Sequence, residues 1–156
     1  MTGLGLDSYY LKAISSYCLK KFIDVIPSDF LVPLTLKANE QYIINLSDSN
    51  SKGTHFVALS IKDDHIIYFD SFGMDCTNHY IISKLIESRK NLVISKTPIQ
   101  AINSYFCGYF CLAFLICDQY NHTLKNFLSL FQKNVDQNDY ICVHIIKNHI
   151  EKIMLE

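Results

Sequence analysis

Cys107 is the residue whose surroundings in the sequence best suit a nucleophile. It is followed by Gly108 and by an apolar run over residues 110–116, which is typical of a helix buried on most of its surface. A thiol in the first turn of a helix lies at the positive end of the helix dipole, which favours the thiolate. Gln100, seven positions earlier, could donate a hydrogen bond to an oxyanion if the loop between them folds back. An isolated cysteine in an apolar helix is usually only a small core residue, so a catalytic role also requires a base.

A histidine and an acid at the ends of two predicted strands meet that requirement. Residues 54–61 and 65–70 are rich in β-branched and aromatic side chains and are joined by three polar residues, so they predict a β-hairpin. His55 begins the first strand and Asp70 ends the second, and antiparallel pairing places these two ends side by side. An acid beside a histidine orients the ring and stabilises the imidazolium. The hairpin therefore predicts a base held by an acid.

The rest of the pattern predicts an α+β fold in a single domain, residues 1–156. The expected helices cover residues 8–21, 77–88, 107–116, 123–132 and 139–154, and the expected strands cover residues 41–46, 54–61, 65–70 and 92–95. Asp7 and Asn138 are the expected N-caps of the first and last helices. Pro27 and Pro33 predict turns between the first helix and the first strand.

Apolar stripes and isolated cysteines and histidines predict the structural residues. The stripe of the first helix is Tyr10, Leu11, Ile14, Tyr17 and Cys18, and that of the last helix is Ile141, Cys142, Ile145, Ile146, Ile150 and Ile153. The cysteines expected in the core are Cys18, Cys111, Cys117 and Cys142, and the histidines expected at the surface are His65, His79, His122, His144 and His149. Cys76 is expected in a loop and is given no role.

Composition argues against several other classes of function. The net charge of −1 gives no reason to expect a nucleic-acid partner, and Arg89 is the only arginine available for a bidentate phosphate clamp. No apolar run approaches the ~20 residues of a membrane span, and no cysteine or histidine pair has the spacing of a metal site. Six cysteines without a CxxC pair or a signal peptide favour free thiols in a reducing, intracellular compartment.

Several motifs in order resemble the superfamily of the adenovirus maturation protease and the SUMO-specific proteases. The distinctive motifs are Gly53-Thr-His-Phe-Val-Ala58, Tyr68-Phe-Asp-Ser-Phe-Gly73, and Gln100 followed by Ser104-Tyr-Phe-Cys-Gly-Tyr-Phe-Cys111. The less distinctive motifs are Phe22-Ile-Asp-Val-Ile-Pro-Ser-Asp29 and Tyr42-Ile-Ile-Asn45. The likeness is strongest to the proteases of virophages and polinton-type elements, and it covers residues 22–116.

This resemblance implies a papain-like-type cysteine protease core. In such a core a small mixed or antiparallel sheet packs on a central helix that carries the nucleophile, with further helices around it. The resemblance implies that Cys107 is the nucleophile, His55 the general base and Asp70 the orienting acid. Gln100 and the backbone N–H of Cys107 would form the oxyanion hole. Where Asp70 stands, the adenovirus enzyme carries glutamate and the SUMO-protease branch carries aspartate.

Phe56 and Gly108 are the substrate-binding residues that the resemblance implies. Phe56 stands where the family usually has tryptophan, so the aromatic wall is kept while the indole N–H is lost. No metal site and no cofactor are expected, because no pair of histidines or cysteines in the sequence has metal-ligand spacing.

The function implied by the resemblance is that of a cysteine endopeptidase that processes capsid and other virion proteins and cleaves after small residues such as glycine. The alternative is a deconjugating isopeptidase acting on a SUMO or ubiquitin-like protein, whose C-terminal Gly-Gly suits the same narrow slot. Acyl transfer, as in related bacterial effector acetyltransferases, would need a basic coenzyme pocket that a single arginine does not provide. The implied partners are protein substrates and, as for the adenovirus relatives, an activating peptide. The implied location is the virion or the host-cell cytoplasm.

Overall fold

A five-stranded mixed sheet forms the centre of the fold, and the expectation of an α+β protein is confirmed. The computed structural model describes residues 8–47 and 55–156. The strands are β1 (Phe22–Pro27), β2 (Gln41–Asn45), β3 (Phe56–Ile61), β4 (His65–Phe69) and β5 (Asn91–Ile94). They lie in the order β1-β2-β3-β4-β5, with antiparallel pairing of β2, β3 and β4 and parallel pairing of β1 with β2 and of β5 with β4.

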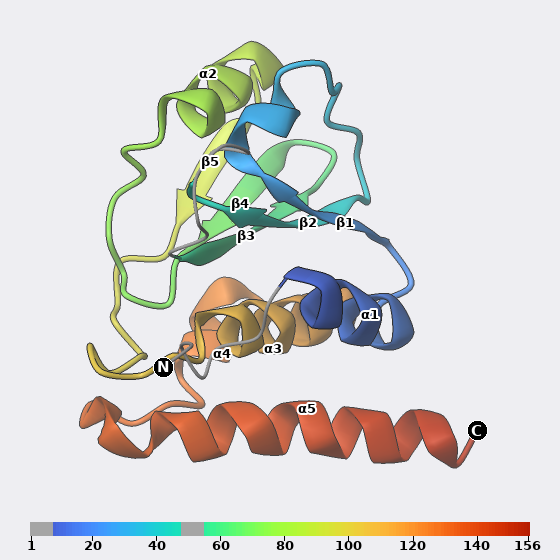
Figure 1. Cartoon of the computed structure of the whole chain (residues 1–156), viewed down its shortest axis with the longest axis vertical. Helices are drawn as coiled ribbons and strands as arrows, with labels where there is room; N and C mark the ends of the chain where they lie inside the picture. Colours follow the sequence, from blue (N-terminus) through green and yellow to red (C-terminus); the bar gives the residue numbers. More distant parts are fainter. Residues whose placement is uncertain (1–7, 48–54) are drawn as a thin grey trace.

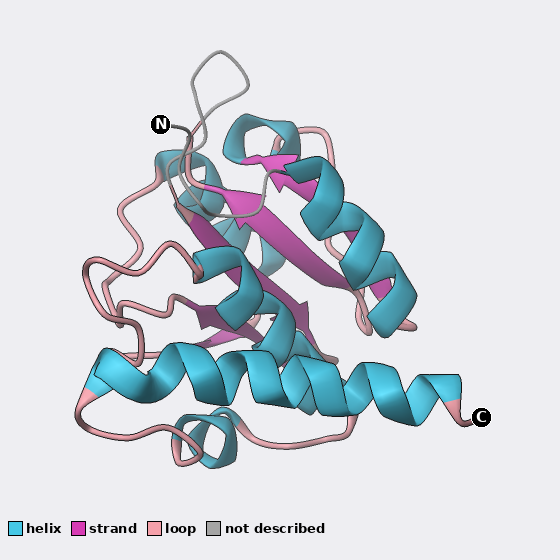
Figure 2. Cartoon of the chain, turned by 60° about the horizontal axis from the view of Figure 1, so that its bottom comes forward, coloured by secondary structure: helices cyan, strands magenta, loops and turns pink. Residues whose placement is uncertain are grey.

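Helices cover both faces of this sheet. They are α1 (Ser8–Cys18), α2 (His79–Ser88), α3 (Cys107–Gln119), α4 (Leu124–Leu128) and α5 (Asn138–Met154), with short 3₁₀ turns η1 (Ser28–Leu31) and η2 (Val135–Gln137). Figure 1 shows α2 on one side of the sheet and α1, α3 and α4 on the other. The long helix α5 lies on the side of α3 that faces away from the sheet and ends at the C-terminus (Figure 1; Figure 2). Within residues 8–47 and 55–156, no helix is long and apolar enough to cross a membrane.

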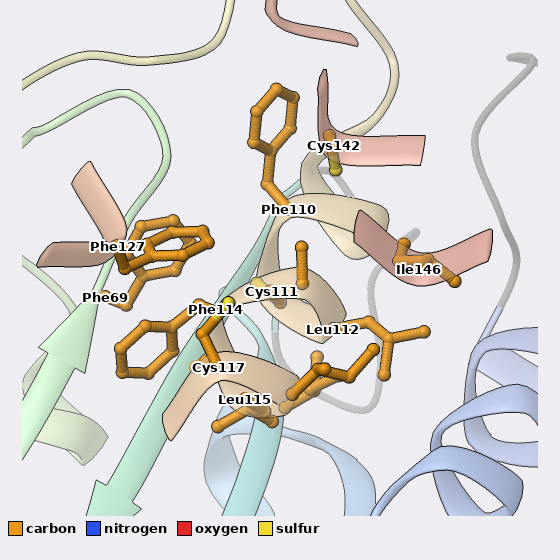
Figure 3. Packing of buried hydrophobic residues seen from close by; sticks show 14 of the residues in the cluster. Phe69, Phe110, Cys111, Leu112, Phe114, Leu115, Cys117, Phe127, Cys142 and Ile146 are labelled. Carbon is orange, nitrogen blue, oxygen red and sulfur yellow. The ribbon is translucent and has the colours of Figure 1, made fainter. Parts of the chain in front are cut away.

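The core between the sheet and α5 is built around α3. Every α3 residue from Phe110 to Cys117 is buried, because the helix packs against β3 on one side and α5 on the other. Phe69 of β4 stacks on Phe114 with ring centroids 4.8 Å apart, and Phe127 of α4 meets both rings edge-on (Figure 3). A helix enclosed in this way must be apolar all round, which is why its sequence shows no polar face. The prediction of a central buried helix is confirmed.

The opposite face of the sheet carries a second, smaller core. Alternate residues of β3, Val57, Leu59 and Ile61, point to this face, whereas Ala58 belongs to the α3 side, as the two-residue period of a strand requires. The core is closed by α2 and η1. Lys84 of α2 is buried, and its Nζ donates hydrogen bonds to the carbonyl oxygens of Val32 (3.1 Å) and Leu34 (2.6 Å). These bonds satisfy the buried ammonium group and join α2 to the segment after η1.

The segment between the first two expected elements differs from the prediction. A turn-rich connection was predicted there, but residues 22–27 form the edge strand β1, whose Pro27 is tolerated because an edge strand leaves backbone donors unpaired. The first helix therefore ends at Cys18 instead of residue 21. Its buried residues are Leu11, Ser15 and Cys18, while Tyr10 and Tyr17 are exposed. The predicted cap Asp7 lies outside the described residues.

Two predictions for the C-terminal part are wrong. Asn138 does not cap α5; its side chain is buried and bridges two loop segments instead. His149 is not a surface residue, because Nε2 lies 2.8 Å from the carbonyl oxygen of Cys18 and the ring packs edge-on against Tyr120. The predicted helix over residues 123–132 is shorter, and α4 ends at Leu128. The other expected helices and strands are confirmed within a few residues of their predicted ends.

Candidate active site

The β3–β4 hairpin brings His55 and Asp70 together at one end of the sheet. Antiparallel pairing of Ala58 with Phe69 sets the register, and the carbonyl oxygen of His55 accepts a hydrogen bond from the N–H of Leu46. The histidine is thereby held just before the start of β3, beside the turn that follows β4. Its Nε2 lies 2.8 Å from Oδ1 of Asp70, and both side chains are largely buried. The structure places this pair as the hairpin geometry predicts.

A tight turn after β4 holds the Asp70 carboxylate. Oδ1 also accepts a hydrogen bond from the backbone N–H of Phe72 at 2.8 Å, and the N–H of Gly73 bonds to the Asp70 carbonyl at 2.9 Å. From β4's other side, Ser95 Oγ accepts from the Asp70 N–H and donates to its carbonyl oxygen. With its backbone and side chain both bonded, the carboxylate has one orientation, and that orientation points at the histidine.

His55 is held in its protonated form by its neighbours. Burial lowers its pKa, but hydrogen bonds to Asp70 and Cys107 and the charges of those two groups outweigh burial and raise the pKa to about 9. Because Nε2 faces Asp70, Nδ1 is the ring nitrogen left for the sulfur of Cys107. Phe72 stacks on the imidazole with ring centroids 4.9 Å apart and an interplanar angle of 26°. The ring is thus fixed on its edge by the acid and on its face by an aromatic side chain.

Cys107 is the first residue of α3 and is half-buried. Among the residues that the structure describes, no acceptor is bonded to its backbone N–H, because the first bond of the helix runs from the N–H of Phe110 to the carbonyl of Phe106. A free N–H at a helix start is a donor available to an anion beside it. Burial raises the pKa of Cys18 and Cys117 to about 11, and the pKa of Cys111 and Cys142 well above its usual value.

Gln100 is buried, and both ends of its side-chain amide have partners. Its Oε1 accepts a hydrogen bond from Ser71 Oγ at 2.5 Å, and its Nε2 donates to the carbonyl oxygen of Ser104 at 2.9 Å and, more weakly, to Ser104 Oγ at 3.3 Å. Its backbone N–H and that of Ile99 both donate to the Ser71 carbonyl. The turn after β4, which carries the acid, therefore also holds the amide that the sequence predicts as an oxyanion donor.

The two predicted substrate contacts, Phe56 and Gly108, face the core. A Cβ on Gly108 would lie 3.0 Å from Cδ2 of Leu11 and 3.5 Å from a ring carbon of Phe56. The missing side chain thus lets the start of α3 approach α1 and β3 closely. Phe56 is buried in the same core. Their contact with a substrate stays a prediction, while their packing is described by the structure.

Four further residues support the site and were not predicted from the sequence. Ser71 bonds the Gln100 amide oxygen, and Ser104 bonds the Gln100 amide nitrogen. Phe72 stacks on the His55 ring, and Ser95 bonds the Asp70 backbone. Ser71 and Phe72 lie in the motif that contains Asp70, so position next to the acid was an available signal. Ser104 begins the motif that contains Cys107, which was a signal of the same kind, whereas Ser95, at the end of a predicted strand, gave none.

Comparison with known proteins adds a likeness of fold. No protein-family model matches the chain, and no curated protein matches it. Among solved structures, the chain is similar to the crystal structure of the selenomethionine ASFV pS273R protease, with 18% sequence identity and a TM-score of 0.48. The match covers 70% of this chain and 42% of that protease, so the chain matches less than half of its length. A likeness at this level does not transfer chemistry, which has to come from the side chains described above.

Proposed function

We propose that the chain is a cysteine endopeptidase in which Cys107 is the nucleophile, His55 the acid and base, and Asp70 the residue that orients the histidine. The observation that carries the proposal is the pairing of His55 with Asp70 at 2.8 Å while the same ring interacts with Cys107 at the start of α3. The acid contacts the base and the base contacts the thiol, which is the arrangement that thiol catalysis requires. The chain acts as one protease domain.

The raised pKa of His55 assigns its starting state. With a pKa of about 9 the imidazole is protonated near neutral pH, and the protonated ring stabilises a thiolate beside it. The thiolate of Cys107 attacks the carbonyl carbon of a peptide bond, and the electron pair of that C=O moves to its oxygen. The N–H of Cys107 and the Nε2 proton of Gln100 that is not bonded to the Ser104 carbonyl stabilise this oxyanion.

Two proton transfers by His55 complete the reaction. As the oxyanion collapses, the C–N bond breaks and the imidazolium gives its proton to the leaving amine, which leaves a thioester on Cys107. Neutral His55 then takes a proton from water while that water attacks the thioester carbonyl. Collapse of the second tetrahedral species breaks the C–S bond, releases the carboxyl product and restores the thiolate and imidazolium. Asp70 keeps the ring oriented throughout.

The substrate part of the proposal comes from the family resemblance of the motifs around His55, Asp70 and Cys107. We propose that the substrates are capsid and other virion precursor proteins, cut after small residues such as glycine during maturation. The site of action would be the virion or the host-cell cytoplasm, and an activating peptide would be a further partner. The resemblance of these motifs to those of the viral proteases supports the choice of substrate, and the site geometry supports the peptide-cleaving chemistry.

A cleavage assay on a proteome-derived peptide library tests the proposal. Wild type should produce new termini that cluster after glycine or another small residue, and Cys107→Ala should produce none. Cys76→Ala is the matched control, because Cys76 is a half-buried cysteine outside the site, and it should cleave as wild type does. Cleavage that persists in Cys107→Ala would contradict the mechanism. Labelling by a SUMO or ubiquitin C-terminal electrophile, without cleavage of the library, would instead favour the deconjugating isopeptidase.

A further inference from the structure

The first residue of α5 contacts the chain just before the loop that joins Gln100 to Cys107. Asn138 is fully buried, and its Nδ2 donates to the carbonyl oxygen of Ile99 and to that of Gln132, both at 2.9 Å. Its Oδ1 accepts from the backbone N–H of Gln132 at 2.9 Å. The residue just before Gln100 is therefore tied to α5 through a side chain whose hydrogen bonds are all made inside the protein.

The next residue of α5 contacts the same loop near its end. Oδ1 of Asp139 accepts a hydrogen bond from Ser104 Oγ at 2.9 Å. The single hydroxyl proton of Ser104 is used in this bond, so the oxygen can only accept from its other neighbours. Those neighbours are the backbone N–H of Phe106 at 3.2 Å and Nε2 of Gln100 at 3.3 Å. Asp139 thus decides which way the Ser104 hydroxyl points.

From these contacts we infer that Asp139 is a positioning residue for the oxyanion site. It acts through Ser104 on two groups at once: the Gln100 amide nitrogen and the loop end that delivers the Cys107 N–H. The inference rests on the function proposed above. It assigns a role in the site to α5, which lies outside the part of the chain that resembles known proteases.

The middle of the loop has few other contacts that could fix its shape. Ile102 is 96% exposed and Tyr105 is 58% exposed, whereas Ala101 is buried and Phe106 packs against the core at the two ends of the loop. A loop with little packing depends on its hydrogen bonds for a single conformation. The Gln100 amide is held by Ser71 at its oxygen and by Ser104 at its nitrogen, and the bond to Ser104 Oγ is the one that α5 affects directly.

Substitution of Asp139 tests this role through a separation of kinetic constants. Asp139→Ala should lower kcat by ~10- to 100-fold with KM nearly unchanged, because a displaced oxyanion donor weakens transition-state stabilisation only. Asp139→Asn keeps an acceptor oxygen for Ser104 and should recover most of the kcat. The matched control is Asp136→Ala, which removes an exposed acid three residues earlier and should leave kcat unchanged.

Two further measurements distinguish positioning from general damage. Alkylation of Cys107 by iodoacetamide forms no oxyanion, so its rate should stay as in wild type when kcat falls. Ser104→Ala combined with Asp139→Ala should be no slower than the slower single variant, because both remove the same hydrogen bond. An Asp139→Ala variant with unchanged kcat, or with kcat and alkylation reduced by the same factor, would overturn the inference.

A readout without substrate keeps this inference separate from the proposed protease activity. The side-chain amide signals of Gln100 in an NMR spectrum, assigned by their loss in Gln100→Glu, should shift in Asp139→Ala and stay in place in Asp136→Ala. If wild type cleaves no peptide, the protease proposal fails while these signals still decide whether Asp139 orients Gln100. Gln100 signals that are identical in Asp139→Ala and wild type would refute the positioning role.

Discussion

The two ends of α3 each lie beside a buried carboxylate, and the two carboxylates have different partners. Asp70 and Asp118 are both only 3% exposed. Asp70 lies near the start of the helix and pairs with His55. Asp118 lies in the last turn, where the helix dipole disfavours an anion, and pairs with Lys62 at 2.8 Å. Ser60 Oγ and Gln41 Nε2 also donate to it, at 2.5 and 2.9 Å.

The difference lies in what each cation can do. The ammonium of Lys62 offers only hydrogen-bond donors, and Ser60 and Gln41 also donate to the Asp118 carboxylate, so this end of α3 is a structural joint. The imidazole of His55 can lose its proton, and besides its bond to Asp70 the ring interacts with the side chain of Cys107. A buried ion pair is thus a candidate for catalysis when its cation can exchange a proton and has a second nitrogen that is free to contact a reacting group.

The strongest test of this difference between the two ends of α3 is to neutralise each carboxylate in turn. Asp70→Asn should lower kcat by about 10³-fold, because the amide no longer stabilises the imidazolium or fixes the ring. Asp118→Asn should leave kcat within about twofold, since it lies at the other end of the helix. Rates on the peptide found in the library assay measure both. A large loss of kcat in Asp118→Asn would mean that the two ends are coupled through α3.

The second test is the pH dependence of stability, to which the His55–Asp70 pair should contribute. The pKa of His55 rises from 6.5 to about 9 on folding, so its contribution is fully present below pH 6.5 and is lost as the pH rises through 9. This contribution is about 3 kcal/mol. Urea unfolding between pH 6 and pH 10 should show the loss in wild type and a flatter curve in His55→Gln. The alkaline limb of kcat/KM should fall near the same pH, since His55 must give its proton to the leaving amine.

Truncation of Asp118, at the C-terminal end of α3, should lower the free energy of unfolding and leave kcat unchanged. Asp118→Ala leaves the buried Ser60 hydroxyl without its acceptor and leaves Gln41 Nε2 with only the Leu115 carbonyl, and we expect a loss of about 2 kcal/mol in the free energy of unfolding. Lys62 is partly exposed and can turn to solvent, which limits the cost. Urea denaturation checks the loss and the peptide assay checks kcat. Unchanged stability would show that the joint at this end of α3 is not needed.

Gly108→Ala should have the smallest effect and decides between two roles. The new Cβ would lie 3.0 Å from a methyl carbon of Leu11, which can shift by a few tenths of an ångström, so a loss of about 1 kcal/mol is expected. If the glycine serves packing alone, KM should not change. A rise in KM without a loss of stability would instead support the substrate contact predicted from the sequence.

Local signals explain what could be predicted. The hairpin, the central helix and the pairing of His55 with Asp70 follow from strand composition, a short polar joint and the two-residue period of strands, all of which lie within one stretch of chain. The same holds for α2, whose predicted range contains the cap Asn78. The candidate site could be assembled from the sequence because its acid and base are joined by a single hairpin.

Long-range partners explain what could not be predicted. β1 contains Asp24 and ends at Pro27, and it is a strand because β2 lies beside it. His149 is buried because α5 passes the end of α1, and its partner Cys18 is 131 residues away in the chain. Asn138 has the residue type of a cap, but loops from two other regions compete for its amide. No local pattern reports on contacts of this kind.

The position of Asp139 late in the chain also orders events during translation. It follows Cys107 by 32 residues, so a ribosome adds it roughly 2–6 s after Cys107. His55, Asp70 and Cys107 therefore all exist in the nascent polypeptide before α5 has been made. If Asp139 has the role inferred for it, the growing chain holds these three side chains while the proposed oxyanion site is incomplete until α5 docks.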